Sequence, residues 1–305
     1  MDSKELFKII ETQNKEKYEL KNSREYKLGK NILETLNFVK KGKFNKILKK
    51  IHDKNIKNKI TKFSKLNNNI LEQINNDIDY RKSKIAIYTC IIGDYDNIQV
   101  PLTKFSNVDY YLFTDNVDKF RKYSKNFIIK EIDNEILKLG KIIANRYIKL
   151  HPSEVLGDYD FYIYVDGNVR IISDIRRFIT KINDKTGIAM HLHRERNCIY
   201  DEVKACILLK RGSKKMLLNQ INRYQKEGFP KEYGMNEATI IVSNNKKIAI
   251  NLLNQWYKEF IKSNSLRDQI AWPYVLWKNN LKIFDVGILG DNIYNNYTIE
   301  MVQHK

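Results

Sequence analysis

The chain has 305 residues, of which 42% are apolar, so it can bury a large core, and this excludes a globally disordered protein. Four prolines and twelve glycines exclude a collagen-like or linker-dominated chain. The formal charge of +19 favours polyanionic partners such as nucleic acid, anionic lipid or phosphorylated substrates, although a lysine-rich composition alone explains part of it.

Residues 1–82 are expected to form a basic helical extension. Glycine is rare in this part of the chain, and apolar residues recur at helical spacing. Residues 1–80 hold 19 Lys and Arg against 11 Asp and Glu, a net charge of +8. The stretch Lys40–Lys65 combines this charge with an apolar stripe. It either lies on an anionic membrane surface or is a solvated helical face packed on the following domain.

The cysteines and the N-terminal residues indicate the cellular compartment in which the protein is expected. Cys90, Cys198 and Cys206 suit neither a complete disulfide set nor a zinc ribbon. Met1 to Gln13 lacks the apolar run of a signal peptide, and no stretch approaches the roughly 18 consecutive apolar residues of a spanning helix. We therefore expect a protein of the reducing cytoplasm, either free or peripheral on the inner face of a membrane.

From residue 83 to residue 305, strand patterns alternate with helix patterns. Short apolar runs that end in polar residues predict strands at 84–92, 108–113, 126–132, 161–165, 188–192 and 238–242. Helical spacing predicts helices at 137–150, 199–210, 214–227 and 246–262. This alternation predicts an α/β domain with an open, mostly parallel sheet flanked by helices, in which ligands bind at the carboxyl ends of the strands.

Asp166, Gly167 and Asn168 follow the buried run Tyr162–Val165. Magnesium and manganese prefer oxygen ligands, and a carboxylate and an amide oxygen two residues apart can hold such an ion against a diphosphate. The pattern therefore predicts a divalent metal site, Mn²⁺ or Mg²⁺, at Asp166 and Asn168. The alternative is an ordinary Asp-Gly turn at the end of a strand.

Two neighbouring strand ends supply candidate nucleotide-binding residues. The first strand and its following loop contain Thr89, Gly93 and Tyr95, and the second strand is followed by Asp115. Acidic groups at these ends accept hydrogen bonds from a base or from ribose hydroxyls, and Tyr95 is available to stack. The alternative is that these residues form ordinary turns.

Arg146 and Lys149 lie three residues apart in a predicted helix and so share one face. On that face they are expected to bind the diphosphate of the donor, together with Asp166 and its metal. The alternative is a basic helix face that is only solvated.

A polar run after the strand at 188–192 supplies candidate substrate contacts. His191 and His193 are two residues apart and can bind metal, but no third ligand has a convincing spacing. His191, His193 and Arg194, together with Asn236, are therefore predicted to contact substrate.

Glu237, Asp268 and Gln269 are the candidate catalytic residues. Glu237 precedes a strand, and Asp268 opens a helix beside Gln269. Either carboxylate can act as a general base or stabilise a transition state. The alternative for Asp268 is a charge that only satisfies the helix dipole.

Seven segments, in order, resemble the plant and bacterial glycosyltransferase-like domain typified by mucilage-related proteins. They cover residues 87–96, 110–116, 144–152, 162–171, 193–202, 234–242 and 267–283. The resemblance implies a GT-A-like nucleotide-diphospho-sugar transferase with a divalent metal at Asp166 and Asn168, and with Asp268-Gln269 near the reacting sugar. The chain departs from the related retaining transferases in two ways: Asn168 replaces a second carboxylate, and the only late histidine is His304.

The sequence thus predicts a metal-dependent, hexosyltransferase-like glycosyltransferase that uses a nucleotide sugar, with a UDP-sugar favoured. The acceptor would be a glycan or a lipid-linked molecule in surface polysaccharide or glycoconjugate synthesis. The alternatives are a non-catalytic basic protein that binds nucleic acid or anionic lipid, and a lipid amide hydrolase. No nucleic-acid-binding signature is recognisable, so specific nucleic-acid binding is not expected.

Overall fold

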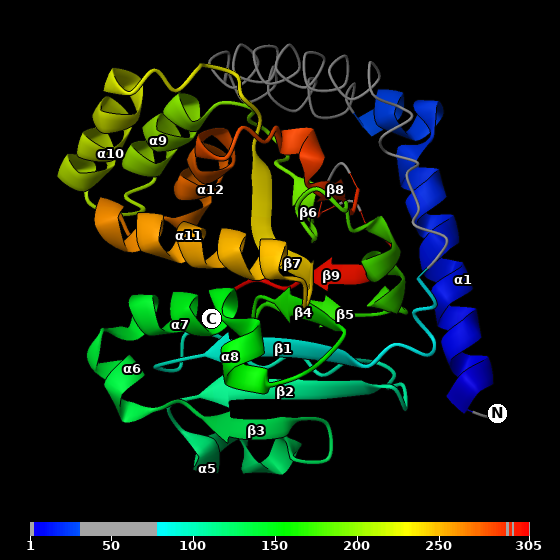
Figure 1. Ribbon diagram of the computed structural model, residues 1–305. Helices are drawn as coiled ribbons and strands as arrows, with labels where there is room; N and C mark the ends of the chain where they lie inside the picture. The colour runs from blue at the N-terminus through cyan, green and yellow to red at the C-terminus, as the bar shows by residue number, and fades with distance from the viewer. Residues whose placement is uncertain (1–2, 31–77, 291–292, 295, 305) are drawn as a thin grey trace.

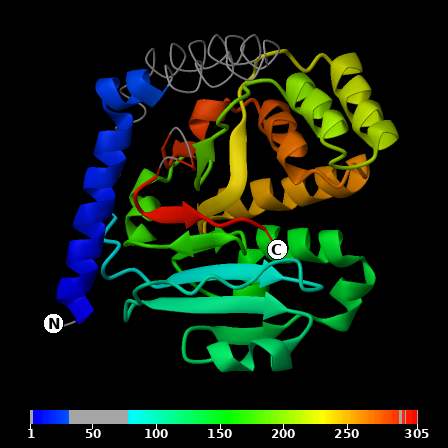
Figure 2. The ribbon, with the colours of Figure 1, turned by 180° about the vertical axis from the view of Figure 1, so that it is seen from behind.

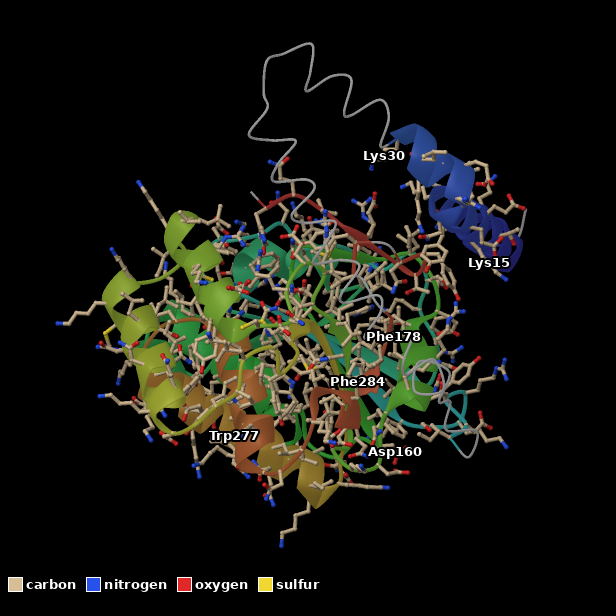
Figure 3. The ribbon with its side chains drawn as sticks, turned by 90° about the horizontal axis from the view of Figure 1, so that it is seen from above. Lys15, Lys30, Asp160, Phe178, Trp277 and Phe284 are labelled. Carbon is tan, nitrogen blue, oxygen red and sulfur yellow. The ribbon has the colours of Figure 1, made fainter. Side chains whose placement is uncertain are left out.

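The computed structural model describes residues 3–30, 78–290, 293–294 and 296–304. Helix α1 (Ser3–Asn22) runs along one side of the body, and residues 24–30 are also helical. In Figure 3 the labels Lys15 and Lys30 mark this N-terminal helical segment, and Trp277 lies on the other side of the body. The basic stripe predicted at Lys40–Lys65 lies outside the described residues. Within the described ranges, no helix is long and apolar enough to cross a membrane.

Seven strands form the central sheet in the order β3-β2-β1-β4-β7-β6-β8 (Figure 1). Their bounds are β1 Ile85–Ile91, β2 Val108–Thr114, β3 Ile128–Glu131, β4 Phe161–Val165, β6 Ile188–Leu192, β7 Asn236–Asn244 and β8 Gly287–Ile288. Strands β3, β2, β1 and β4 are parallel to one another. The carboxyl ends of these four strands therefore meet at one edge of the sheet.

The helices cover both faces of this sheet. Their bounds are α5 Val117–Phe120, α6 Asn134–Lys138, α7 Lys141–Leu150, α8 Pro152–Leu156, α9 Ile199–Leu208, α10 Lys214–Lys226, α11 Lys247–Ser263 and α12 Asp268–Lys278, with the 3₁₀ helices η1 Arg121–Tyr123, η2 Ile175–Lys181 and η3 Ile283–Asp285. Every residue of β1 is buried, because helices pack on both sides of it. This explains why the strand reads as an unbroken apolar run rather than an alternating one.

Alternate residues of the strands enter two different cores. Tyr88 and Tyr164 point to the face covered by α7, α11 and α12. Ile87 and Ile163 point to the opposite face, which η2 and α5 cover. A third apolar cluster joins α9, α10 and α12, where the rings of Tyr224 and Tyr274 stack with their centroids 3.8 Å apart. This cluster fixes the start of α12 against the rest of the domain.

The structure confirms a mostly parallel α/β sheet flanked by helices, with two corrections. Strand β7 runs antiparallel between β4 and β6. The helix predicted over residues 137–150 is two helices, because α6 ends at Lys138 and α7 begins at Lys141. Gly140 between them has φ +100°, a backbone conformation that glycine adopts at little cost and that a helix cannot contain.

Candidate functional site

Asp166 follows β4 directly, where the chain leaves the sheet. Its backbone N–H donates to the carbonyl of Thr239 at 3.0 Å, and its carbonyl accepts from the N–H of Val169 at 3.0 Å, which closes a tight turn. A Cβ on Gly167 would lie 3.0 Å from Cγ1 of Ile91, so glycine allows this turn to pack against the end of β1. The Asp166 side chain remains 34% exposed and accessible to a ligand.

Arg146 and Lys149 of α7 both contact Asp268, the first residue of α12. Nε of Arg146 lies 3.3 Å from Oδ1 of Asp268, and Nζ of Lys149 lies 3.0 Å from Oδ2. Nζ of Lys149 is also 3.9 Å from Oδ1 of Asp166. Lys149 is only 2% exposed and Asp268 only 4%. One buried ammonium therefore links the carboxylate after β4 with the carboxylate at the start of α12, and these residues do not form a merely solvated basic face.

The charges in this cluster stabilise one another. Burial alone would raise the pKa of Asp268, but Arg146, Lys149 and Arg267 outweigh it and hold the pKa below its usual value. Burial opposes the charge of Arg146, yet Asp268 keeps the pKa of that guanidinium above its usual value. Three cations, Arg146, Lys149 and Arg267, thus act on Asp268, and a bound divalent cation would add to the positive charge that a diphosphate needs.

The C-terminal segment passes beside Asn168. Strand β9 (Ile299–Met301) pairs with β5 (Val169–Ile171) in a separate two-stranded antiparallel sheet, and Figure 2 shows the chain continuing from β9 toward the ends of the β1 and β2 strands. The amide Nδ2 of Asn168 donates to the carbonyl of Val302 at 3.1 Å. The same nitrogen lies 3.3 Å from Nε2 of His304. The late histidine therefore reaches the predicted metal site.

A buried carboxylate orients the ring of His304. Nδ1 of His304 lies 2.8 Å from Oδ1 of Asp96, which is buried. Because a carboxylate only accepts hydrogen bonds, Nδ1 donates to Asp96, and Nε2 is the ring nitrogen that faces the Asn168 amide. Histidines that bind metal are commonly oriented in this way. The exposed ring of Tyr95 lies 5.3 Å from the His304 ring, between centroids.

The predicted nucleotide-binding residues lie at the ends of β1 and β2. The N–H of Gly93 donates to both oxygens of Asp115, at 3.0 and 2.9 Å, so Asp115 ties the loop after β1 to the end of β2. The hydroxyl of Thr89 is buried and has no hydrogen-bond partner within the described part of the chain. Thr89 lines a small cavity that also reaches Asp166. An orphaned hydroxyl at such a cavity is a group that a ligand can satisfy.

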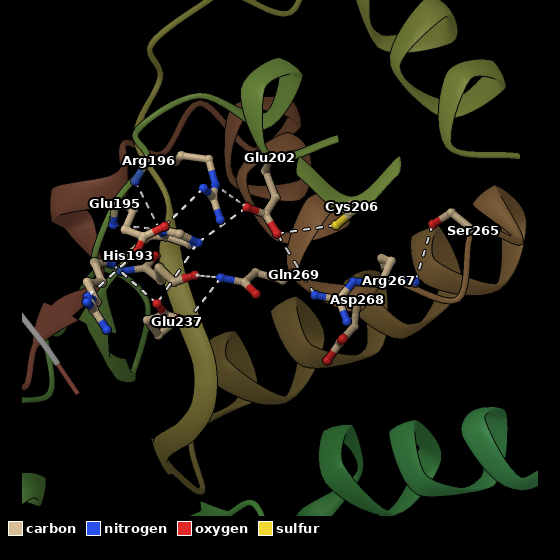
Figure 4. Close-up of polar contacts among 12 residues, drawn as sticks. His193, Glu195, Arg196, Glu202, Cys206, Glu237, Ser265, Arg267, Asp268 and Gln269 are labelled. Atoms are coloured by element: carbon tan, nitrogen blue, oxygen red, sulfur yellow. Dashed lines mark hydrogen bonds and ion pairs between the residues drawn. The ribbon is translucent and has the colours of Figure 1, made fainter. Parts of the chain in front are cut away.

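Gln269 is held by the start of β7 (Figure 4). Its Nε2 donates to the carbonyl of Asn236 at 2.9 Å and to Oε2 of Glu237 at 3.3 Å. Oε1 of Glu237 accepts from the N–H of Arg194 at 3.3 Å. The Asn236 side chain is buried and accepts a hydrogen bond from Nε1 of Trp272 at 3.0 Å. With its amide nitrogen engaged, Gln269 has its carbonyl oxygen available to a substrate.

A buried acid-base network continues from Glu237 to α9 (Figure 4). Nδ1 of His193 accepts from the backbone N–H groups of Glu195 and Arg196, each at 3.1 Å, so Nε2 carries the ring proton. That Nε2 lies 3.4 Å from Oε2 of Glu202 and 4.0 Å from Oε1 of Glu237. Burial alone would raise the pKa of Glu202, but its hydrogen bond with His193 and the charge of Arg196 lower it to about 2.

His191 and Arg194 differ in their access to a substrate. His191 is fully buried, its Nε2 lies 3.1 Å from Nδ2 of Asn296, and its ring packs against Phe178. Burial lowers the pKa of His191 to about 3, so the ring is neutral. Arg194 is exposed enough to meet a ligand, and its guanidinium lies 4.9 Å from the ring centre of Tyr294. Of the four predicted substrate contacts, Arg194 is thus partly open, whereas His191, His193 and Asn236 are buried.

Sequence reasoning did not single out Glu202, and it gave no place in the site to Asp96 and His304. A glutamate in an amphipathic helix usually faces solvent. Glu202, however, lies three residues after Ile199 and four before Cys206, both of which are buried in the face of α9 that packs on α10. That helical spacing is the signal that could have identified Glu202. The three thiols, Cys90, Cys198 and Cys206, are buried and free.

An open, largely parallel sheet with charged and amide side chains at its carboxyl edge is the architecture of nucleotide-binding α/β proteins. The family model described as TOD1/MUCI70, glycosyltransferase-like domain, matches residues 43–304, which is most of the chain. The chain therefore belongs to the TOD1/MUCI70 family. This confirms the resemblance seen in the sequence and the assignment to the glycosyltransferases. No match was found among curated proteins.

The solved structures that are similar to this chain include two glycosyltransferases. Mouse xyloside xylosyltransferase 1 in its apo form is 7% identical, with 67% of this chain and 84% of that chain covered and a TM-score of 0.43. The galactosyltransferase LgtC in complex with donor and acceptor sugar analogues is 11% identical, with 68% and 73% covered and a TM-score of 0.40. Both similarities are distant, and the family assignment rests on the family model.

Proposed function

We propose that this chain transfers a sugar from a nucleotide-diphosphate sugar, with a UDP-sugar favoured, to a glycan or lipid-linked acceptor, in a reaction that depends on Mn²⁺ or Mg²⁺. The observation that carries the proposal is the cluster at the carboxyl edge of the sheet. There Lys149 lies 3.9 Å from Asp166 and 3.0 Å from Asp268, although these residues come from three separate elements.

The side chains around Asp166 fit a divalent metal. Asp166 offers a partly exposed carboxylate, and His304 offers an imidazole nitrogen whose ring is oriented by Asp96. Asn168 is buried, and its amide nitrogen contacts the Val302 carbonyl and His304. Carboxylate, imidazole and amide groups suit Mn²⁺ well. Among the described residues, no group of three or more His, Cys, Asp or Glu side chains is arranged so that it could hold a metal ion by itself. Part of the coordination would therefore come from the diphosphate of the donor, as is usual for Mg²⁺ at nucleotide sites.

The other residues of the site have separate roles in the proposed reaction. A bound divalent ion would supply charge neutralisation for the leaving nucleotide diphosphate. Arg146 is the more accessible of the two cations and can bind phosphate oxygens, while Lys149 holds Asp166 and Asp268 in place. Gln269 presents its carbonyl oxygen toward positive charge that develops on the sugar. Glu237 positions the Gln269 amide and is a positioning residue, since both its oxygens accept hydrogen bonds.

Calorimetric titration with UDP tests this proposal. Binding of UDP is expected with Mn²⁺ present and is expected to weaken strongly when a chelator removes the metal. GDP serves as the comparison for the choice of nucleotide. Equal affinity for UDP with and without metal would contradict the metal role, and no binding of either nucleotide would contradict the transferase proposal itself.

The predicted cytoplasmic location and the role in surface polysaccharide or glycoconjugate synthesis stay predictions of the sequence. The same holds for the docking of residues 1–80 on an anionic membrane. Vesicle sedimentation of the full chain and of a variant that starts near Arg81 tests the docking of this extension, which the described residues cover only in part.

A further inference from the structure

The turn between α9 and α10 exposes two adjacent leucines. Leu208, the last residue of α9, is 82% exposed, and Leu209 is 58% exposed. Single exposed apolar residues are common on protein surfaces. Two neighbours at the tip of a helical hairpin form instead a small projecting apolar surface, and Leu208 is the most exposed large apolar residue within the described ranges.

The same turn is strongly basic. Between Val203 and Asn219 the sequence holds five Lys and Arg residues and no Asp or Glu. Four of them, Lys210, Arg211, Lys214 and Lys215, are exposed and follow the two leucines directly. Within the described part of the chain, none of these four forms an ion pair with a carboxylate. The tip therefore presents apolar side chains beside positive charges that have no carboxylate partner among the described residues.

The backbone of this turn is well fixed. The N–H of Arg211 donates to the carbonyl of Cys206 at 2.8 Å, and Lys210 has φ +54°, which together close the end of α9 in a Schellman-type arrangement. A Cβ on Gly212 would lie 2.9 Å from the carbonyl oxygen of Ser265, so the turn packs closely on the segment that leads into Asp268. The exposed leucines are thus held on a rigid tip attached to the corner that carries the candidate site.

The residue types in the α9–α10 turn favour one kind of binding partner over the others. A surface that binds single-stranded nucleic acid usually offers aromatic side chains on which the bases stack. Residues 207–215 contain no aromatic residue. A second copy of this chain would bring together two molecules of charge +19. In an anionic bilayer, apolar side chains enter the boundary of the acyl chains while neighbouring lysines and arginines meet lipid phosphates.

We propose that the α9–α10 turn is a membrane-docking tip, with Leu208 and Leu209 inserted into the interface of an anionic bilayer and the four following basic residues bound to its headgroups. This inference goes beyond the proposed function, because it needs no sugar transfer. Docking by the tip would place the α11–α12 corner, and with it Asp268, close to the lipid surface. Figure 1 shows α9 and α10 on the side of the molecule away from α1, so this contact is separate from the N-terminal extension as far as it is described.

Vesicle sedimentation of the full chain tests the proposal. The vesicles contain phosphatidylcholine with or without phosphatidylglycerol. The wild-type chain is expected to bind only the anionic vesicles, and binding is expected to fall as salt rises. The substitutions Leu208→Ser and Leu209→Ser together are expected to lower the affinity about tenfold or more. Lys214→Ser with Lys215→Ser is expected to lower it by a similar factor and to flatten its dependence on salt.

A matched control lies at the start of α11, the end of that helix away from the tip. Ile248 is 42% exposed and follows the exposed Lys247, so Lys247→Ser with Ile248→Ser removes the same kinds of groups elsewhere. This control is expected to bind vesicles like the wild type. Unchanged binding of the leucine variant, or binding of neutral vesicles as strong as of anionic ones, would overturn the proposal. The affinity of the same variants for UDP is expected to match that of the wild type. Failure of the docking proposal would therefore appear in the vesicle experiment, and failure of the transferase proposal would appear in the UDP titration.

Discussion

Lys149 is the residue on which the two carboxylates of the site depend. It is almost fully buried, and its ammonium approaches both Asp166 and Asp268. Removing one partner of a buried ion pair typically costs about 3–5 kcal/mol, because the remaining charge has lost both water and its counter-ion. Helical spacing predicts that Arg146 and Lys149 share one helix face, but it does not reveal that Lys149 is enclosed.

We expect Lys149→Met to lower the free energy of unfolding by about 3 kcal/mol. Adding Asp268→Asn in the same chain should restore part of this loss, since the uncompensated charge is then gone. Urea unfolding of both single variants and the double variant measures this coupling. Lys141→Met, at an exposed position of the same helix, is the control. A loss for Lys149→Met as small as for Lys141→Met would contradict the buried ion cluster.

Glu202 is expected to make stability depend on pH in the acid range. Its pKa in the folded chain is about 2, below the usual 4.5, so the folded state favours the ionised form. The stabilisation is therefore fully present above about pH 5 and is lost as the pH falls toward 2, by roughly 3 kcal/mol in all. Urea unfolding at several pH values measures this slope. Glu202→Gln should unfold more easily at pH 7 and show a shallower loss with acid, whereas an unchanged slope would mean that other groups cause it.

At the scale of elements, the strands were the most predictable part of the fold. The apolar runs of β1, β2 and β4 predict strands because both faces of each are covered, which leaves no polar alternation. The direction of β7 was not predictable in the same way, since a buried strand has the same apolar pattern whether it runs parallel or antiparallel. Gly140, by contrast, was a visible signal for the break between α6 and α7.

In the candidate site, too, features set by neighbouring residues could be predicted from the sequence, whereas contacts between distant residues could not. Asp166 and Asn168 are recognisable because they follow β4 within three residues. The contact of His304 with Asp96 joins residues 208 positions apart, and it exists because β9 pairs with β5. No pattern along the sequence encodes that pairing, since β9 has only three residues. The histidine could be named from the sequence, but its place in the site could not.

The C-terminal segment gives a prediction at this scale. We expect His304→Ala to lower the affinity for UDP in the presence of Mn²⁺ by about 10–100-fold, as is usual when the support of a metal site is lost. The affinity for UDP without metal serves as the internal control and should not change. Calorimetric titration measures both. An equal loss with and without metal would show that His304 supports the fold or the nucleotide rather than the metal.

At the scale of the whole molecule, helix α1, the α9–α10 turn and the candidate site lie in different places. Helix α1 packs on one side of the body, where the rings of Tyr18 and Tyr297 lie 5.6 Å apart. The α9–α10 turn projects from the other side. The candidate site lies at the carboxyl ends of the parallel strands, between the half built on β1–β4 and the half that contains α9 to α12. The total charge favours anionic partners in general, whereas the arrangement of elements gives the proposed phosphate site and the proposed lipid-docking turn separate places.

We propose that Asp166 takes part in metal-dependent sugar transfer. The most direct test is the release of UDP from a panel of UDP-sugars by the wild type and by Asp166→Asn, each with Mn²⁺ and with chelator. We expect the wild type to release UDP only with metal, and the variant to be slower by about 100–1,000-fold while its circular dichroism and unfolding midpoint stay close to those of the wild type. Equal rates for the two chains, or a wild-type rate that the chelator leaves unchanged, would contradict the claim.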